Sequence, residues 1–307
     1  MTLFTTGFGF TSTAHEVISD VDLTGKVMIV TGGAGGIGVE TVRALASAGA
    51  DVTIATRRPD AAVEIARDLR NATGNQKISV AELDVADPAS VAAFVAGWDR
   101  PLHVLVNNAG VMALPTLERT RDGREMQFAT NYLGHFALTL GLHRWLKAAG
   151  GARVVSVSSI GSLYGSVQWD DPDFRFTVYD PVLAYAQSKT ACILMAVAIA
   201  QRWHADGITA NALNPGAIAT NLQRHTGGLR TPEHLRKTPQ QGAATTVLLA
   251  GSPLVHGISG RYFDHCNQAE TITSRDNRFA GVAHYALDQA NADRLWTMAT
   301  TMIGGPA

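Results

Sequence analysis

The chain of 307 residues contains only two cysteines, Cys192 and Cys266, and neither belongs to a CxxC pair or to a cluster with histidine. The sequence therefore indicates no disulfide framework and no metal site, and a reducing compartment such as the cytoplasm suits this usage. The charges nearly cancel, with 25 Lys and Arg against 26 Asp and Glu and a net charge of −1. This balance gives no reason to expect nucleic acid or an anionic membrane surface as a partner.

Long apolar runs are also missing. The first basic residue is Lys26, so the preceding residues lack the positive segment and apolar stretch of a signal peptide. We interpret residues 1–22 as an N-terminal arm. The longest apolar stretch, residues 191–200, is too short to span a bilayer. We predict that it is a buried core helix, that the chain has no membrane span, and that the protein is cytoplasmic.

What the chain does contain, from Lys26 onward, is an alternation of short β-branched runs with longer alanine-rich stretches. This alternation is typical of βα units that build a parallel sheet. It predicts an α/β fold, a doubly wound, Rossmann-type sheet of seven parallel strands with helices on both faces. The predicted strands are Val27–Thr31, Val52–Thr56, Ser79–Leu83, Val104–Val106, Arg153–Val157, Thr209–Leu213 and Gly260–Phe263. The predicted helices are Ile37–Ala48, Ala61–Arg70, Pro88–Ala96, about Arg124–Lys147, about Val182–His204 and Pro239–Leu249.

No internal repeat and no linker rich in Pro or Ser divides the chain. We predict one domain over residues 23–265, with residues 266–307 as a C-terminal extension of it. Two segments fall outside the alternation: an acidic and aromatic insertion at 161–181, and a polar, glycine-containing loop at 223–237. Because such a sheet binds its ligands beyond the carboxyl ends of the strands, both segments are candidates for substrate contacts.

A glycine-rich turn follows the first predicted strand and opens a helix. Glycines allow a tight turn and a close approach to a pyrophosphate, to which the helix N-terminus offers free N–H groups and the positive end of its dipole. Glycines also serve turns that bind nothing, but the order strand, turn, helix, strand favours a dinucleotide site. The predicted contacts in this turn are Gly32, Gly33, Gly35, Gly36, Ile37 and Gly38.

The end of the second predicted strand carries two arginines and no carboxylate, in Ala55-Thr56-Arg57-Arg58. An acid there would bond the ribose 2′-hydroxyl of NAD, whereas a guanidinium suits the 2′-phosphate of NADP. The sequence therefore favours NADP(H) over NAD(H), although both arginines could simply be solvated. Asp84, after the third strand, is placed to contact the adenine, although an ordinary acid at a strand end would look the same. Val85, next to it, is a further predicted cofactor contact.

Tyr185 and Lys189 stand four residues apart and would share one face of a helix. An ammonium in that position stabilises a phenolate and lowers the pKa of the tyrosine from about 10. Such a pair can make the phenol an acid or base, although the same spacing also occurs on solvated helices.

Four motifs in this order resemble the short-chain dehydrogenase/reductase family: the glycine turn, Asn107-Asn108-Ala109-Gly110, Ser158-Ser159, and Tyr185 with Lys189. The resemblance covers about residues 23–264. The segment 130–136 and the wide gap between serine and tyrosine resemble the retinol-dehydrogenase-like and WW-domain-oxidoreductase-like branch. Residues 8–16 also resemble plant members associated with the chloroplast import apparatus, so a role outside metabolism stays open.

The resemblance implies a catalytic set of Asn131, Ser159, Tyr185 and Lys189. Tyr185 would be the general acid or base. Ser159, preferred to Ser158 as the second of the pair, would bond the substrate oxygen. Lys189 would hold the nicotinamide ribose, and Asn131 would fix a water in a proton relay. The further cofactor contacts implied, beside Tyr185 and Lys189 themselves, are Asn108, Ala109, Gly110, Pro215, Gly216, Ile218 and Thr220.

We therefore predict an NADP(H)-dependent oxidoreductase that interconverts a carbonyl and an alcohol on a small, fairly apolar molecule. The alternative is an NADP(H)-binding sensor or scaffold with little turnover. His265 and Cys266 follow the last strand, and we expect them at most to line the substrate pocket. His135 and His143 are interpreted as packing or surface residues. The resemblance also implies that the chain could form a homo-oligomer through its two long helices, unless the C-terminal extension covers them.

Overall fold

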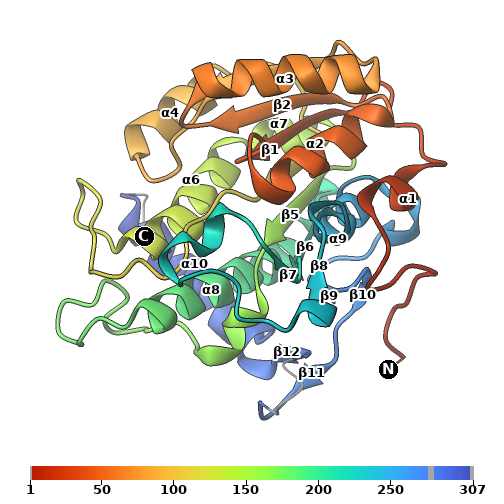
Figure 1. The fold of residues 1–307 in the computed structure, drawn as a ribbon. Helices are drawn as coiled ribbons and strands as arrows, with labels where there is room; N and C mark the ends of the chain where they lie inside the picture. Colours follow the sequence, from red (N-terminus) through yellow and green to blue (C-terminus); the bar gives the residue numbers. More distant parts are fainter. Residues whose placement is uncertain (1, 276–279, 305–307) are drawn as a thin grey trace.

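The computed structural model describes residues 2–275 and 280–304. A sheet with strand order β10-β9-β6-β5-β4-β1-β2-β3 forms the centre of this part of the chain (Figure 1). The parallel strands are β1 (Val27–Thr31), β2 (Asp51–Thr56), β3 (Ile78–Glu82), β4 (Val104–Asn107), β5 (Arg153–Val157), β6 (Thr209–Asn214) and β9 (Tyr262–Asp264). The seven predicted parallel strands are confirmed, with small shifts at their ends. An eighth, antiparallel edge strand, β10 (Asn267–Gln268), was not predicted.

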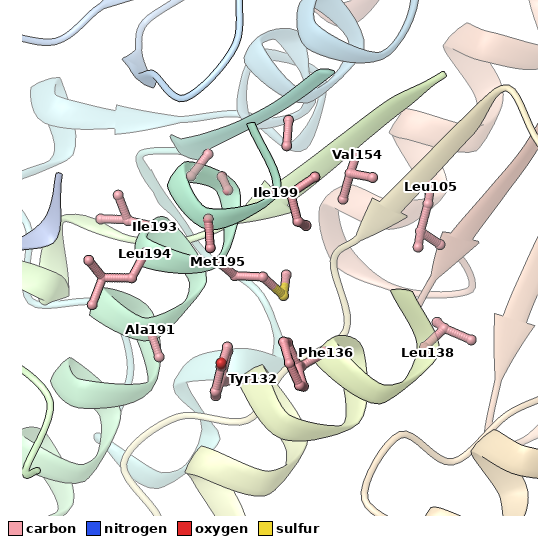
Figure 2. Close-up of a cluster of buried hydrophobic side chains, with 14 of the residues drawn as sticks. Leu105, Tyr132, Phe136, Leu138, Val154, Ala191, Ile193, Leu194, Met195 and Ile199 are labelled. Carbon is pink, nitrogen blue, oxygen red and sulfur yellow. The ribbon is translucent and has the colours of Figure 1, made fainter. Parts of the chain in front are cut away.

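Alternate residues of each strand face opposite layers of helices, as the two-residue period of a strand requires. Met28 and Val30 belong to a core shared with α2 (Gly36–Ser47), α3 (Pro59–Thr73) and α9 (Pro239–Gly251). Ile29 and Leu105 belong to a second core, on the other face, with α4 (Pro88–Ala96), α6 (Gly134–Gly141) and α8 (Pro181–Arg202). Figure 2 shows part of this second core, where α6 and α8 meet the strands. Both faces of the sheet are therefore covered, as predicted.

The strand order reverses between β1 and β4, which are neighbours although β2 and β3 lie between them in the sequence. The chain builds one half of the sheet outward from β1 and then returns to build the other half from β4. At such a reversal the loops after the two strands diverge to opposite faces and leave a crevice at the carboxyl edge. This crevice is where a ligand of the fold is expected.

The apolar stretch 191–200 lies in α8, whose residues from Ala184 to Ile199 are all buried. By length and composition α8 could cross a membrane, but 89% of its apolar window is buried inside the protein. It is a core helix, as the sequence predicts.

The single long helix predicted over about 124–147 is wrong. The segment consists of α5 (Met126–Phe128), a π-helical turn (Ala129–Leu133), α6 and, after a break at Leu142, α7 (His143–Ala148). The π-helical turn places Asn131 where its side chain bonds both the backbone of Val111 and the hydroxyl of Ser188. These tertiary bonds override the regular helical period, which a sequence pattern cannot anticipate.

The N-terminal arm and the helix near the C-terminus pack into different cores of the protein. In the N-terminal arm, residues 4–8 run beside β10, and α1 (Ala14–Ile18) packs into the core that contains α9. The helix α10 (Gln289–Met302) packs on α8, and Trp296 meets the ring of Phe136 edge-on with centroids 5.0 Å apart. The C-terminal extension therefore covers α8, a helix through which a homo-oligomer was considered. Residues 276–279 and 305–307 of that extension lie outside the described residues.

Candidate functional site

A cavity of about 1200 Å³ opens at the carboxyl ends of the parallel strands. Its volume exceeds the roughly 300–1,000 Å³ common for small-molecule pockets, so it has room for a cofactor and a substrate together. Most of the residues predicted to form the site line this cavity: Gly32, Gly35, Gly36, Ile37, Arg57, Arg58, Asp84, Val85, Asn108, Ala109, Gly110, Ser159, Tyr185, Lys189, Pro215, Gly216, Ile218 and Thr220.

The glycine turn presents backbone rather than side chains to the cavity. Gly32 and Gly36 have φ angles of +65° and +52°, which side chains rarely adopt. Helix α2 begins at Gly36; its N-cap, Gly35, provides no side-chain hydrogen bond, and no acidic residue occupies the first turn. The amides of Gly32 and Gly38 donate to the carbonyl oxygens of Ala55 and Gly35. The amides at the start of α2, at Gly36 and Ile37, can therefore meet an anion, with the positive end of the helix dipole behind them. The turn fits a pyrophosphate.

Gly33 and Gly38, both predicted as cofactor contacts, do not line the cavity. A Cβ at Gly38 would collide with the carbonyl oxygen of Gly32, and one at Gly33 would come within 3.0 Å of the Val42 side chain. These two glycines allow the turn to pack tightly against its own strand and helix. Gly33 and Gly38 therefore determine the shape of the turn without lining the cavity.

The part of the cavity wall that follows β2 and β3 carries the predicted charges. Arg57 and Arg58 lie after β2 and are exposed, so both guanidiniums can move onto a ligand. Asp84 lies after β3 on the same cavity wall, and its Oδ1 accepts a hydrogen bond from the amide of Ala86 at 2.9 Å. This bond fixes the loop after β3 and leaves the other carboxylate oxygen available to the cavity.

Tyr185 and Lys189 lie one turn apart on α8 and both line the cavity, with only 8% and 4% of their surfaces exposed. The Lys189 ammonium donates to the carbonyl oxygen of Val157 at 3.0 Å and lies 5.7 Å from the centre of the Tyr185 ring. Gly161 packs against that ring so closely that a Cβ there would come within 2.9 Å of Tyr185 Cε1. The phenol is therefore confined beside a fixed positive charge.

The two serines after β5 have different environments. Ser158 is 2% exposed, and its hydroxyl donates to the carbonyl oxygen of Lys189 at 2.7 Å. Ser159 is partly exposed at the cavity, and its Oγ accepts a hydrogen bond from the amide of Gly161 at 3.0 Å. Because an acceptor role leaves the hydroxyl proton of Ser159 free to donate, this serine is the one suited to a substrate oxygen.

Asn131 lies behind the cavity wall and is 2% exposed. Its Oδ1 accepts from the amide of Val111 at 2.8 Å, while its Nδ2 donates to the Val111 carbonyl oxygen and to Ser188 Oγ. It therefore ties the loop after β4 to α8, next to Lys189. His135, interpreted from the sequence as a packing or surface residue, is buried in the same region and bonds the backbone of Asn131.

The two segments proposed for substrate contacts differ. Loop 223–237 contributes many wall residues, among them Arg224, Leu229 and Leu235. Insertion 161–181 contributes only Tyr164. Its acidic part is used internally: Asp173 accepts from the amide of Glu125 at 2.9 Å.

Glu125 itself caps α5 and lies deep in the protein, where burial raises the pKa of its carboxyl to about 7.

Sequence reasoning missed several wall residues, including Phe10, Met112 and Leu222, because no motif marks them. Among the residues that the structure describes, no group of three His, Cys, Asp or Glu side chains could hold a metal ion.

Residues 26–228 match the protein family described as short chain dehydrogenase. A Streptomyces antibioticus protein named "Probable oxidoreductase" is 51% identical over 91% of this chain and 98% of its own length. Human retinol dehydrogenase 11 is 37% identical over 94% of this chain and 89% of its own length. The plant protein TIC 32 B of Brassica napus, a chloroplastic short-chain dehydrogenase, is 36% identical over 97% and 94%.

Among solved structures, an uncharacterized protein from Mycobacterium paratuberculosis shares the fold over 97% of this chain and 100% of its own, with a TM-score of 0.75 and 30% identity. A gluconate 5-dehydrogenase from Beutenbergia cavernae, described as NAD(P)-dependent and with bound NADP, covers 79% of this chain and 95% of its own, at 26% identity and a TM-score of 0.61. Sequence and structure thus agree on one family.

Proposed function

Because the chain belongs to the short-chain dehydrogenase family, whose members use a nicotinamide nucleotide, we propose that it is an NADP(H)-dependent oxidoreductase. It interconverts a carbonyl and an alcohol on a small, fairly apolar molecule. The observation that carries this proposal is that Ser159, Tyr185 and Lys189 line the same cavity as the glycine turn at the start of α2. An acid, an oxygen-binding hydroxyl and a nucleotide cradle are thereby brought together.

In this proposal the bound cofactor supplies or accepts the hydride, and the chain supplies the proton and the orientation. In the direction of reduction, Tyr185 donates its phenolic proton to the substrate oxygen; in oxidation the phenolate takes that proton back. Ser159 donates a hydrogen bond to the same oxygen and stabilises the charge that develops on it.

Preference for NADP(H) is supported by the end of β2. Arg57 and Arg58 line the cavity there, and no carboxylate occupies the position that would bond a ribose 2′-hydroxyl. A planar guanidinium can bind a phosphate with two parallel hydrogen bonds. The gluconate 5-dehydrogenase relative, whose description includes bound NADP, is in line with this assignment.

The substrate end of the cavity supports an apolar substrate. The cavity that Ser159 and Tyr185 line is also lined by Phe10, Met112, Leu222, Leu229 and Leu235. Such side chains bind by burial of apolar surface rather than by hydrogen bonds.

A second candidate is a cofactor-binding sensor or scaffold with little turnover. We retain this candidate because the chain is similar to TIC 32 B, a chloroplastic member of the family. A sensor would bind NADP(H) but would have no need of the wall formed by Ser159, Tyr185 and Lys189. A cytoplasmic location and a homo-oligomeric state stay predictions in either case.

The experiment is a panel of aldehydes, ketones and secondary alcohols, with NADPH oxidation or NADP reduction followed by absorbance. We expect turnover with some apolar members of the panel. Binding of NADPH without turnover of any member would contradict the enzyme proposal and favour the sensor.

A further inference from the structure

The N-terminal arm reaches the cavity, and Phe10 is the residue that lines it. Upstream of Phe10 the arm is fixed to the edge of the sheet. The amide of Thr6 donates to Asn267 Oδ1 at 2.6 Å, and Asn267 Nδ2 donates to the carbonyl oxygen of Phe8 at 2.9 Å. Asn267 lies in β10, 261 residues along the chain from Thr6. The arm therefore has a defined place, and Phe10 is brought to the cavity by these bonds.

The ring of Phe10 is held from two sides. The His265 ring meets it edge-on, with centroids 5.1 Å apart, and the Lys237 ammonium lies 5.1 Å from its centre. Lys237 is 4% exposed, and within the described chain its Nζ makes no hydrogen bond. The π face of Phe10 is thus a principal neighbour of this buried charge. Lys237 also packs against Gly216, so Phe10 is linked to the turn predicted to bind the nicotinamide.

His265 reaches the cavity through a strained turn. β9 and β10 are joined by His265 and Cys266 alone, whose φ angles are +48° and +64°. Two-residue hairpin turns with both φ angles positive normally use Asn-Gly, because side chains disfavour this conformation. Non-glycine residues keep such a conformation only where their surroundings enforce it.

The surroundings of this turn include the arm. Cys266 is fully buried; its amide donates to Thr245 Oγ1 at 3.0 Å, and its carbonyl oxygen accepts from Thr6 Oγ1 at 3.0 Å. Phe10 packs on the His265 ring itself. The arm and α9 together hold the turn in the conformation that brings His265, with 40% of its side-chain surface exposed, to the cavity wall.

We propose that Phe10 and His265 form a recognition wall for an aromatic group on the carbonyl or alcohol substrate, and that the N-terminal arm builds this wall. The inference rests on the proposed function. Two rings already arranged edge to face leave ring surface at the cavity, and aromatic groups pack on such surface with centroids about 4.5–7 Å apart. Neither ring belongs to the glycine turn, and Phe10 meets the turn predicted to bind the nicotinamide through the side chain of Lys237. We therefore expect the wall to act on the substrate rather than on the affinity for the nucleotide.

The test compares two aldehydes of similar size, benzaldehyde and cyclohexanecarboxaldehyde, with NADPH. We expect Phe10→Ala to lower kcat/KM for benzaldehyde about tenfold, mainly through KM, because an apolar contact discriminates to about that extent. The aliphatic aldehyde should change much less, and the Kd of NADPH should not change. His265→Asn should also lower kcat/KM for benzaldehyde more than for the aliphatic aldehyde. Asparagine is chosen because it tolerates the positive φ angle of this position. The matched control is Phe176→Ala, because Phe176 is 92% exposed and outside the cavity wall.

Equal losses for both aldehydes, no loss for either, or a weakened NADPH affinity would overturn the recognition wall. A second measurement separates this failure from failure of the proposed function. Saturation-transfer NMR of acetophenone with the NADP-loaded protein reports binding without turnover. If wild-type protein reduces no carbonyl but binds acetophenone in a Phe10-dependent manner, the recognition wall is supported and the oxidoreductase proposal is contradicted. Binding that is the same in wild type and Phe10→Ala overturns the wall.

Discussion

His135 Nδ1 lies 3.0 Å from the carbonyl oxygen of Asn131, within the π-helical turn that carries Asn131. A carbonyl oxygen only accepts, so the ring proton is on Nδ1. Burial lowers the pKa of His135 to about 4, which keeps the ring neutral and makes Nε2 an acceptor. The hydroxyl of Thr31, 2.9 Å away, donates to it. The histidine thus links the end of β1 to the predicted catalytic asparagine.

This network continues into the cofactor loop. Thr31 Oγ1 accepts from the amides of Asn108 and Ala109, each at 2.9 Å. The Asn131 carbonyl oxygen also lies 3.2 Å from Cys192 Sγ, which donates to it. His135 and Cys192 together occupy both lone pairs of that oxygen. If the water that Asn131 is predicted to fix were bound to this carbonyl oxygen, it would have to displace one of these two donors.

The first prediction concerns the pH dependence of stability. Below pH 6.5 the unfolded chain protonates this imidazole, whereas folded His135 stays neutral down to about pH 4, so the free energy of unfolding falls as pH decreases through that window. Across the whole window the free energy of unfolding falls by roughly 3 kcal/mol. This decrease is absent in His135→Leu, which has no imidazole at this position. The variant should be about 2–4 kcal/mol less stable near neutral pH, because two buried polar groups lose a partner. Its deficit should shrink towards pH 4.

Urea unfolding at a series of pH values measures this difference. His256→Leu serves as the control, because His256 is exposed. A deficit of His135→Leu that does not change with pH would contradict the buried, neutral state of His135.

A second prediction uses the contact between Gly161 and Tyr185. The Cβ of Gly161→Ala would come within 2.9 Å of Tyr185 Cε1, so the ring must shift away from its place beside Lys189. We expect kcat to fall by about tenfold or more, because a displaced acid transfers its proton poorly. The Kd of NADPH should change little. Gly97→Ala, at a helix end where the new Cβ would make only ordinary contacts, the nearest at 3.5 Å, is the control and should leave turnover unchanged. Undiminished kcat in Gly161→Ala would show that the ring is not confined.

These contacts also show where sequence reasoning stops. The parallel sheet, the glycine turn and the pair Tyr185 and Lys189 are local patterns, each readable from a few neighbouring residues, and the structure brings them to one cavity. The π-helical turn depends on bonds between Asn131 and residues at positions 111 and 188. Phe10 enters the cavity through bonds to β10 at the far end of the chain. Such distant pairings leave no periodic trace in a single sequence.

A third prediction addresses cofactor preference. Removal of a guanidinium that binds the 2′-phosphate should weaken NADPH binding by about tenfold or more, since charge-assisted hydrogen bonds are worth about 1.5–3 kcal/mol. NADH binding should be unchanged in Arg57→Ala. The preference should also decrease at high salt, because Arg57 and Arg58 are exposed. Fluorescence titrations of both nucleotides provide the measurement.

Arg67→Ala is the matched control for that titration, because Arg67 lies on α3 in a surface ion pair with Glu64. It should alter neither affinity. Equal affinities for NADPH and NADH in the wild type, with no change when Arg57 or Arg58 is replaced by alanine, would refute the assignment to NADP(H).

A fourth prediction concerns α10, which covers α8. Leu295 is 1% exposed in the core that α10 shares with α6 and α8. Leu295→Ala should lower the free energy of unfolding by about 2–5 kcal/mol, the usual cost of such a buried cavity. Thr297→Ala, at an exposed position of the same helix, should change it by less than about 0.5 kcal/mol. Similar stabilities of the two variants would mean that α10 contributes little to the core.

We propose Tyr185 as the acid and base of a hydride-transfer reaction, and this role has its own test. It is tested most directly by measuring kcat and the Kd of NADPH for Tyr185→Phe, with a carbonyl substrate that wild-type protein reduces. The phenylalanine keeps the ring packed against Gly161 and removes only the hydroxyl. We expect a loss of kcat of about 10²–10⁴, the usual contribution of a general acid, with NADPH affinity retained. Turnover by Tyr185→Phe at the wild-type rate would contradict it.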